Sequence, residues 1–201
     1  QPVELLSAIR ATTRVIDGLL LDEIDAAGKQ GVTLSYCALG AGLDARWYRL
    51  GERLMGLVDN YWEIDLPGVL GAKGDLLQNS PFLNSWAPVV ASPAALADWG
   101  ADIESKQPLL IVSDHLAERV CDEGFETLLQ GLRSRFSRVR WILGLPARKA
   151  GEAWSRSEFE RCGWQVENEI TLGKRPPVKA YGQFVVVPGV EAARVVVLSP
   201  G

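Results

Sequence analysis

The fold of this chain is decided by residues 32–45, which read VTLSYCALGAGLDA. Residues 32–39 are apolar, β-prone and few enough for a buried strand, and they run directly into Gly40, Ala41 and Gly42. A turn between strand and helix that lacks side chains lets a ligand approach the backbone closely. The stretch therefore predicts the first strand of an α/β sheet, followed by a turn that lines a nucleotide-like cofactor.

Helices and strands are expected on both sides of this turn. Apolar residues recur at helical spacing over residues 3–27, with a break at 11–13 that predicts two consecutive helices. The other predicted helices are 45–56, 67–77, 93–99, 118–136 and 155–161. The predicted strands are 32–39, 57–64, 89–90, 109–113, 139–143, 164–172, 182–187 and 194–198, with a hairpin across Pro188 and Gly189 joining the last two.

This order of elements defines the fold class. Alternating strands and helices up to residue 145, then strands without intervening helices, predict a Rossmann-like α/β fold. Its doubly wound sheet is expected to be mostly parallel, with an antiparallel C-terminal edge. The chain has 201 residues, of which 47% are hydrophobic, so it can bury one substantial core, and no linker divides it. We expect a single domain over residues 1–201.

Composition and charge exclude several classes of protein. The net charge of -4 and the pI of about 5.2 arise from interspersed acidic and basic residues, so we expect no nucleic-acid partner. No apolar run reaches the roughly 18 residues that span a bilayer, and no secretory signal is visible, which predicts a cytoplasmic protein without membrane contact. Cys37, Cys121 and Cys162 lack metal-ligand spacing, so we expect free, buried thiols and no metal site.

Asp65 is the second candidate cofactor residue. It lies 23 residues beyond Gly42, at the end of the second predicted strand, where a carboxylate can accept hydrogen bonds from two ribose hydroxyls. Both nicotinamide cofactors and S-adenosylmethionine use this arrangement. With Ala45 in the last position, the turn also fits the dinucleotide pattern G-x-G-x-x-G/A, so the glycines alone do not choose between the two. The structural alternative is that Asp65 caps the helix beginning near Pro67.

Three motifs carry a family resemblance. They are TRVID at residues 13–17, LGAGLDARWYRL at 39–50 and EIDLP at 63–67. Together they resemble successive motifs of the leucine carboxyl methyltransferase family, including its bacterial branch of polyketide O-methyltransferases. The resemblance covers residues 10–145, and residues 158–166 are similar to the family's later helix and Gly-Trp strand. It implies a class I methyltransferase fold and S-adenosylmethionine as the cofactor.

The resemblance also assigns roles to individual residues. Arg14 would hold the methionine carboxylate of the cofactor, Gly40 and Gly42 would pass beneath its methionine and ribose, and Asp65 would bind the ribose hydroxyls. Arginine suits this task because its planar fork can grip a carboxylate with two hydrogen bonds. The alternative for Arg14 is a solvated charge on a helix surface.

Two departures from the family pattern bear on chemistry. The family carries Glu-Gly after its fourth strand, where this chain has Asp114-His115. Asp114 keeps a carboxylate at the cofactor edge of the sheet. His115, the only histidine, could remove a proton from a hydroxyl nucleophile, or it could simply pack at the strand end.

The second departure is the short segment at residues 146–154, where the family inserts a substrate-covering region. We therefore expect an open cleft that accepts a large substrate or is completed by another subunit, in a homo-oligomer or with a partner. Most of the seven tryptophans should be packing residues, but Trp86 and Trp154 lie in expected loops and could line the cleft.

These observations lead to one main functional hypothesis and two alternatives. The main hypothesis is an S-adenosylmethionine-dependent O-methyltransferase that acts on a carboxylate or hydroxyl of a small-molecule or carrier-bound metabolite. Such a transfer depends chiefly on in-line orientation and desolvation, so it needs no visible catalytic cluster. The shortened lid motivates a binding or assembly module instead, and the glycine pattern alone motivates an NAD(P)-dependent oxidoreductase.

Overall fold

A seven-stranded sheet organises the computed structural model, which describes residues 2–101, 103, 106–114, 116–145, 154–172, 178–180, 183–185 and 193–201. The strand order is β3-β2-β1-β4-β5-β9-β6. The strands are β1 (Leu34–Leu39), β2 (Val58–Asp65), β3 (Pro88–Val90), β4 (Leu109–Asp114), β5 (Val139–Leu145), β6 (Trp164–Thr171) and β9 (Arg194–Pro200). β1 to β5 pair in parallel, and β9 runs antiparallel to both of its neighbours. The expected α/β fold is confirmed, and its antiparallel pairing lies at the expected end.

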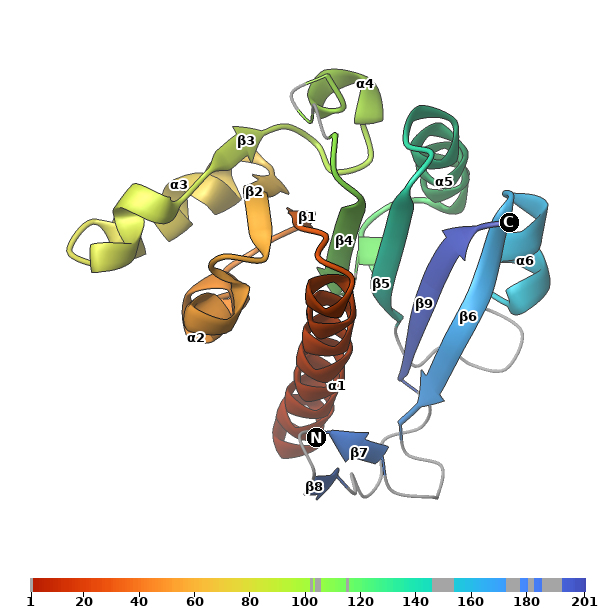
Figure 1. Ribbon diagram of the computed structural model, residues 1–201, viewed down its shortest axis with the longest axis horizontal. Coiled ribbons are helices and arrows are strands. Elements are labelled where there is room, and N and C mark those ends of the chain that lie inside the picture. Colours follow the sequence, from red (N-terminus) through yellow and green to blue (C-terminus); the bar gives the residue numbers. More distant parts are fainter. Residues whose placement is uncertain are drawn as a thin grey trace.

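Helices cover both faces of this sheet, as Figure 1 shows. They are α1 (Pro2–Lys29), α2 (Arg46–Leu54), α3 (Pro67–Leu77), α4 (Leu96–Trp99), α5 (Asp122–Arg135) and α6 (Arg156–Arg161), with short 3-10 turns η1 (Pro81–Ser85) and η2 (Leu116–Glu118). Alternate residues of β1 enter different cores: Tyr36 and Ala38 meet α1 and α2, whereas Cys37 and Leu39 face the side of α4, α5 and α6. The strands are thus buried on both faces, as a parallel sheet requires.

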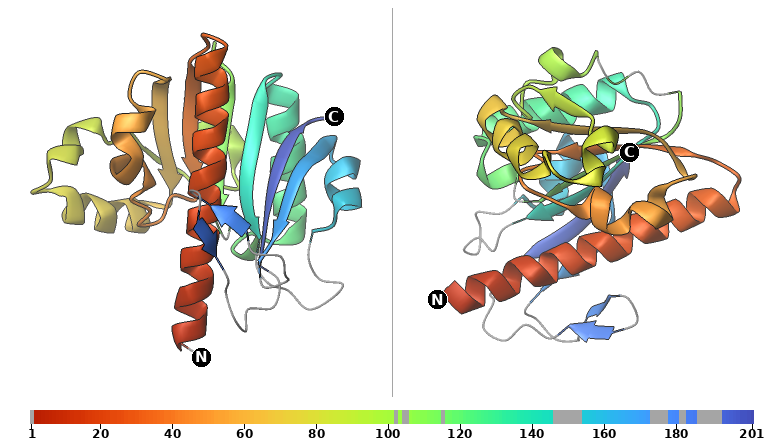
Figure 2. Two further views of the ribbon diagram at one scale, coloured as in Figure 1. Left: turned by 60° about the horizontal axis from the view of Figure 1, so that its bottom comes forward. Right: turned by 90° about the vertical axis from the view of Figure 1, so that its left-hand side faces the viewer.

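The first helix differs from its prediction. α1 is continuous over 28 residues, and both views of Figure 2 show its N-terminal end extending beyond the sheet. The expected break at residues 11–13 does not occur, because Ala11 and Thr12 are buried and continue the stripe of Val15 and Ile16. Packing of that stripe outweighs the weak helical propensity of threonine.

The C-terminal region also differs. Gln183–Val185 (β8) pairs with Val178–Ala180 (β7) in a separate small sheet, so the expected pairing of this segment with Arg194–Pro200 is wrong. β9 instead pairs with β5 and β6. Its four central residues, 195–198, are buried alternately in the two cores, which requires a position inside the main sheet. Pro188 and Gly189 lie outside the described residues.

Two smaller expectations need correction. The helix expected from residue 118 begins at Asp122, because residues 116–118 form η2, whose Leu116 and Ala117 are buried at the end of β4. Cys37 and Cys162 are buried free thiols as expected, but Cys121 is exposed because it precedes the first turn of α5. None of the helices in the described part of the chain combines the length and apolarity that a membrane crossing needs.

Candidate functional site

The glycine turn lies at the carboxyl end of β1. Gly40 and Gly42 have φ values of 69° and 53°, in the left-handed region that side chains disfavour. A Cβ on Gly40 would also lie 3.1 Å from a methyl carbon of Leu116. The amides of Gly40 and Ala41 donate to the Ile64 carbonyl at 2.9 and 3.2 Å. The turn is therefore folded back onto the end of β2, where Asp65 follows.

Asp65 accepts a hydrogen bond from the backbone of the glycine turn. One carboxylate oxygen accepts the Gly42 amide at 2.7 Å, and the other accepts the Leu66 amide at 2.8 Å. Leu66 is the N-cap residue of α3 and no side chain caps this helix, so the structure does not place Asp65 as its cap. A carboxylate has about four acceptor positions, so each oxygen retains one for a ligand hydroxyl. The buried carboxylate and the glycine turn form one unit.

Exposed apolar residues flank this unit in the sequence and in the strand register. Leu43, Leu66 and Val90 are 61%, 48% and 60% exposed, although each is a large hydrophobic residue. Leu43 follows Gly42, Leu66 follows Asp65, and Val90 pairs with Asp65 in the register of β2 and β3. Apolar side chains next to a hydrogen-bonding centre are typical of the lining of a site for a heteroaromatic ring.

Asp114 lies at the same edge, at the end of β4. Its partner in β5 is Gly144, and a Cβ on Gly144 would collide with the Asp114 carboxylate. That Cβ would also lie 3.3 Å from the Cδ1 methyl of Ile16. Gly144 thus makes room for the carboxylate beneath α1, and Asp114 is half-buried there.

Arg14 precedes Ile16 by two residues on α1. It is exposed, and no ion pair joins it to another side chain that the structure describes. Because Ile16 packs beside Gly144, this part of α1 crosses the carboxyl ends of β4 and β5. The structure therefore brings the Arg14 segment, the glycine turn, Asp65 and Asp114 to one edge of the sheet. That edge of an open α/β sheet is where ligands bind.

Comparison with known proteins agrees with this geometry. The model of the leucine carboxyl methyltransferase family matches residues 1–108, which is more than half of the chain. The chain belongs to the leucine carboxyl methyltransferase family. No curated protein matches its sequence.

Solved structures that resemble this leucine carboxyl methyltransferase family member support the same fold. The mitomycin 7-O-methyltransferase MmcR has a TM-score of 0.55 at 15% identity, over 85% of this chain and 50% of that one. LepI in complex with S-adenosylmethionine has a TM-score of 0.54 at 12% identity, over 85% and 43%. The Pnkp1/Rnl/Hen1 RNA repair complex has a TM-score of 0.52 at 16% identity, over 88% and 40%. The chain spans about half the length of MmcR, and less of the other two.

The remaining candidate residues have different outcomes. His115 and most of the segment 146–154 lie outside the described residues. Trp154 does not line a cleft: it is buried, with its ring centroid 4.8 Å from that of Phe125. Trp86 is partly buried and donates its indole N–H to Glu63 at 2.8 Å, which ties it to β2, and its place in a substrate cleft stays a prediction.

Sequence reasoning missed a buried network of charges in this family member. Asp17 binds the guanidinium groups of Arg46 and Arg49, and Arg46 also binds Asp44. Burial by itself would lower the pKa of Arg46, but the carboxylates of Asp44 and Asp17 raise it above its ordinary value, so the side chain stays charged. Charged residues inside otherwise apolar motifs were the available signal, because a buried charge needs a partner.

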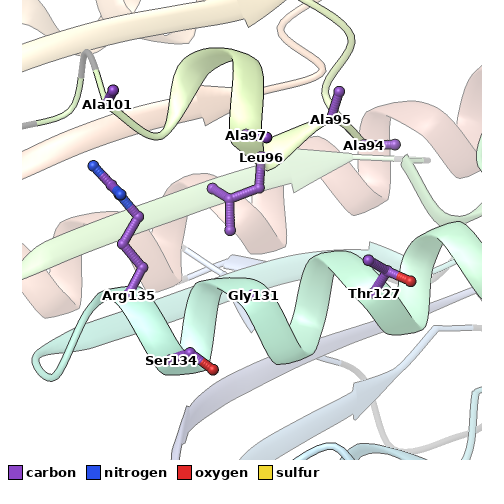
Figure 3. A pocket seen from close by; sticks show the side chains of 9 residues that line it. All are labelled: Ala94, Ala95, Leu96, Ala97, Ala101, Thr127, Gly131, Ser134 and Arg135. Atoms are coloured by element: carbon purple, nitrogen blue, oxygen red, sulfur yellow. The ribbon is translucent and has the colours of Figure 1, made fainter.

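A separate surface pocket lies between α4 and α5. Its volume is about 560 Å³. Figure 3 shows the residues that line it: Ala94, Ala95, Leu96, Ala97, Ala101, Thr127, Gly131, Ser134 and Arg135. None of them belongs to the glycine turn or its carboxylates, so this pocket is distinct from the candidate cofactor site. Within the described residues, no group of three or more His, Cys, Asp or Glu side chains is arranged to hold a metal ion.

Proposed function

We propose that this chain binds S-adenosylmethionine at the carboxyl edge of its sheet and transfers the methyl group to an oxygen of a small-molecule or carrier-bound metabolite. The observation that carries the proposal is the Gly42 amide held at 2.7 Å by the buried carboxylate of Asp65, with Leu43, Leu66 and Val90 exposed around it. This centre offers acceptors for ribose hydroxyls and apolar contacts for an adenine ring.

The charges at the edge fit the methionine end of the same cofactor. Arg14 is an exposed cation on α1, and its guanidinium suits a carboxylate. Asp114 places a carboxyl group at the end of β4, which suits an ammonium group. A nicotinamide dinucleotide has no amino-acid group to use this pair.

The chemistry of the transfer places few demands on the protein. When bound, S-adenosylmethionine supplies a methyl group on a sulfonium, and the protein orients the acceptor and excludes water. A carboxylate acceptor is already ionised at neutral pH. For a hydroxyl acceptor we propose His115 as the base, with the acceptor oxygen as the nucleophile in either case.

The test compares three ligands on three proteins: the wild type, Arg14→Met and a control variant. S-adenosylhomocysteine and 5′-methylthioadenosine share the nucleoside, but only the first has a carboxylate for Arg14. We expect Arg14→Met to weaken S-adenosylhomocysteine binding by about 1.5–3 kcal/mol, the range for hydrogen bonds to charged groups, and to leave methylthioadenosine binding unchanged. Calorimetric titration measures both affinities.

Arg53→Met is the matched control, because Arg53 is an exposed arginine on α2 whose only role in the described structure is a pair with Asp25 at 3.0 Å. It should change neither affinity. NAD should give no binding to any of the three proteins. Binding of NAD without S-adenosylhomocysteine would select the oxidoreductase, and binding of no ligand to the wild type would select the assembly module.

A further inference from the structure

Lys73 is a buried lysine on α3. Its side chain is 4% exposed, which is rare for a residue whose ammonium group is strongly hydrated in water. Its Nζ lies 2.7 Å from an oxygen of Glu63 and donates to the backbone carbonyl of Asp44 at 2.5 Å. The Tyr48 ring lies against the same ammonium, with 5.6 Å between Nζ and the ring centroid. Lys73 therefore joins α3 to Asp44, which lies two residues before the start of α2.

Glu63 has several partners besides Lys73. It is 1% exposed on β2, and it accepts hydrogen bonds from the Tyr61 hydroxyl and from the Trp86 indole at 2.8 Å. The Trp86 ring in turn packs on Gly74 of α3, where a Cβ would lie 3.1 Å from it. The carboxylate is thus hydrogen-bonded on both oxygens without the lysine, and what Lys73 adds is a compensating charge and the bond to Asp44.

Asp44 closes the glycine turn and connects it to neighbouring side chains. Its amide donates to the Ala41 carbonyl at 3.0 Å, which closes the turn. Its carboxylate accepts the Arg46 amide at 2.8 Å and also binds the Arg46 guanidinium, which reaches Asp17 of α1 at 2.7 Å. Arg46 therefore holds the side chain of Asp44, while Lys73 holds its carbonyl.

A path of alternating charges results, in the order Glu63, Lys73, Asp44, Arg46 and Asp17. It starts two residues before Asp65 and ends three residues after Arg14. Replacing a buried ion pair by apolar residues often leaves stability unchanged or improves it. A methionine in place of Lys73 could fill the same buried space, but it could not donate to the Asp44 carbonyl.

We propose that Lys73 is a positioning residue that fixes the shape of the glycine turn for the cofactor. It does so through its hydrogen bond to the Asp44 carbonyl, with Glu63 as the counter-charge that keeps the ammonium buried. The consequence for ligand affinity rests on the proposed function, whereas the consequence for the turn does not. Lys73 acts through the backbone and does not touch the ligand.

The test separates an effect on the shape of the glycine turn from an effect on the stability of the fold. K73M leaves the Glu63 charge buried without its cation, so it should lower both stability and affinity. The double variant E63Q/K73M removes both charges, and we expect it to regain most of the lost stability because no unpaired charge remains. Its affinity for S-adenosylhomocysteine should stay about 10- to 100-fold weaker than that of the wild type, since the Asp44 carbonyl is still without its donor.

Hydrogen exchange supplies a readout that does not depend on any ligand. Amides of residues 40–45 should exchange faster in E63Q/K73M than in the wild type, with amides of β4 and β5 unchanged. R53M serves as the control for loss of a cation near α2, and it should alter neither affinity nor exchange.

The outcomes are distinct. If the double variant regains affinity and slow exchange at residues 40–45 as well as stability, the proposed role of Lys73 is overturned. Absence of S-adenosylhomocysteine binding in the wild type would overturn the proposed function instead, and the exchange of residues 40–45 would then decide the role of Lys73 alone.

Discussion

The two halves of this chain bury different kinds of side chain. Within residues 11–108, five charged residues are buried as far as the structure describes them: Asp17, Arg46, Glu63, Asp65 and Lys73. In the described parts of residues 109–201, the buried polar or charged residue is Ser113, whereas both halves bury aromatic rings. Buried charges cost free energy, so their concentration in the first half indicates that a defined shape is needed there. The family model matches that half, residues 1–108.

Trp141 provides the largest expected effect, and it belongs to the second half, where no charged residue that the structure describes is buried. Its ring is fully buried on β5, with centroids 5.6 Å from Phe125 and 6.1 Å from Trp164, and its indole donates to Ser113 at 2.7 Å. Trp141→Ala should lower the free energy of unfolding by about 3–5 kcal/mol. Urea titration measures this loss.

The two halves have separate roles if a loss of stability in the second half leaves the affinity for the cofactor product unchanged. At a temperature where Trp141→Ala is folded, its affinity for S-adenosylhomocysteine should equal that of the wild type. Trp141→Phe, which keeps a ring, should lose less stability. A fall in affinity of the folded Trp141→Ala protein would break the division between the two halves.

Asp65→Ala should give the opposite pattern. We expect S-adenosylhomocysteine binding to weaken by about 1.5–3 kcal/mol, because the carboxylate holds the Gly42 amide and offers acceptors to the ribose. Asp65→Asn should be milder, since one oxygen remains. Asp59→Ala is the control on the same strand: its carboxylate is exposed and accepts from the Thr33 hydroxyl at 2.5 Å. Equal affinities of folded Asp65→Ala and wild type in calorimetric titration would remove Asp65 from the cofactor site.

The smallest expected effect is at the start of α6, in the second half. The Ser155 amide and hydroxyl donate to the Glu158 carboxylate at 2.5 and 2.7 Å, and these bonds lower the pKa of Glu158. Ser155→Ala should cost about 0.5–2 kcal/mol of stability at neutral pH. A carboxylate whose pKa is lower in the folded state stabilises the fold at pH values above its unfolded-state pKa. This stabilisation is lost as the pH falls through the folded-state pKa.

The difference in stability between Ser155→Ala and the wild type should therefore shrink below the ordinary pKa of glutamate, near 4.5. Affinity for S-adenosylhomocysteine should be unchanged at neutral pH. A stability difference that stays constant as the pH falls to 3 would contradict the role of the charged carboxylate.

Local signals explain what the sequence predicted well. Pro67 at the first turn of α3 and the glycines after β1 mark element boundaries directly, and the predicted and observed ranges of α3 coincide. Gly42 and Asp65 were expected at one edge of the sheet because each lies at the end of a parallel strand. The Gly42 amide nitrogen and an Asp65 carboxylate oxygen are 2.7 Å apart. Their roles toward a ligand stay predictions.

Long-range pairing explains what the sequence did not predict. The residues of β9 are compatible with any buried strand, and only the complete sheet selects a place between β5 and β6. The bond from Lys73 to Asp44 crosses 29 residues and ends on a carbonyl, for which no side-chain pattern exists. Periodicity reports which face of an element is apolar, but it does not report which partner covers that face.

The place of β9 has a consequence for how the chain folds during its synthesis. Among the strands that the structure describes, β6 pairs with β9 alone, and β9 follows it in the sequence. When β6 leaves the ribosome, its intended neighbour has not been made, so its backbone amides and carbonyls must face water or a chaperone. The first half can form its parallel pairs in order of synthesis, whereas β6 can join the sheet only after β9 has emerged beside β5.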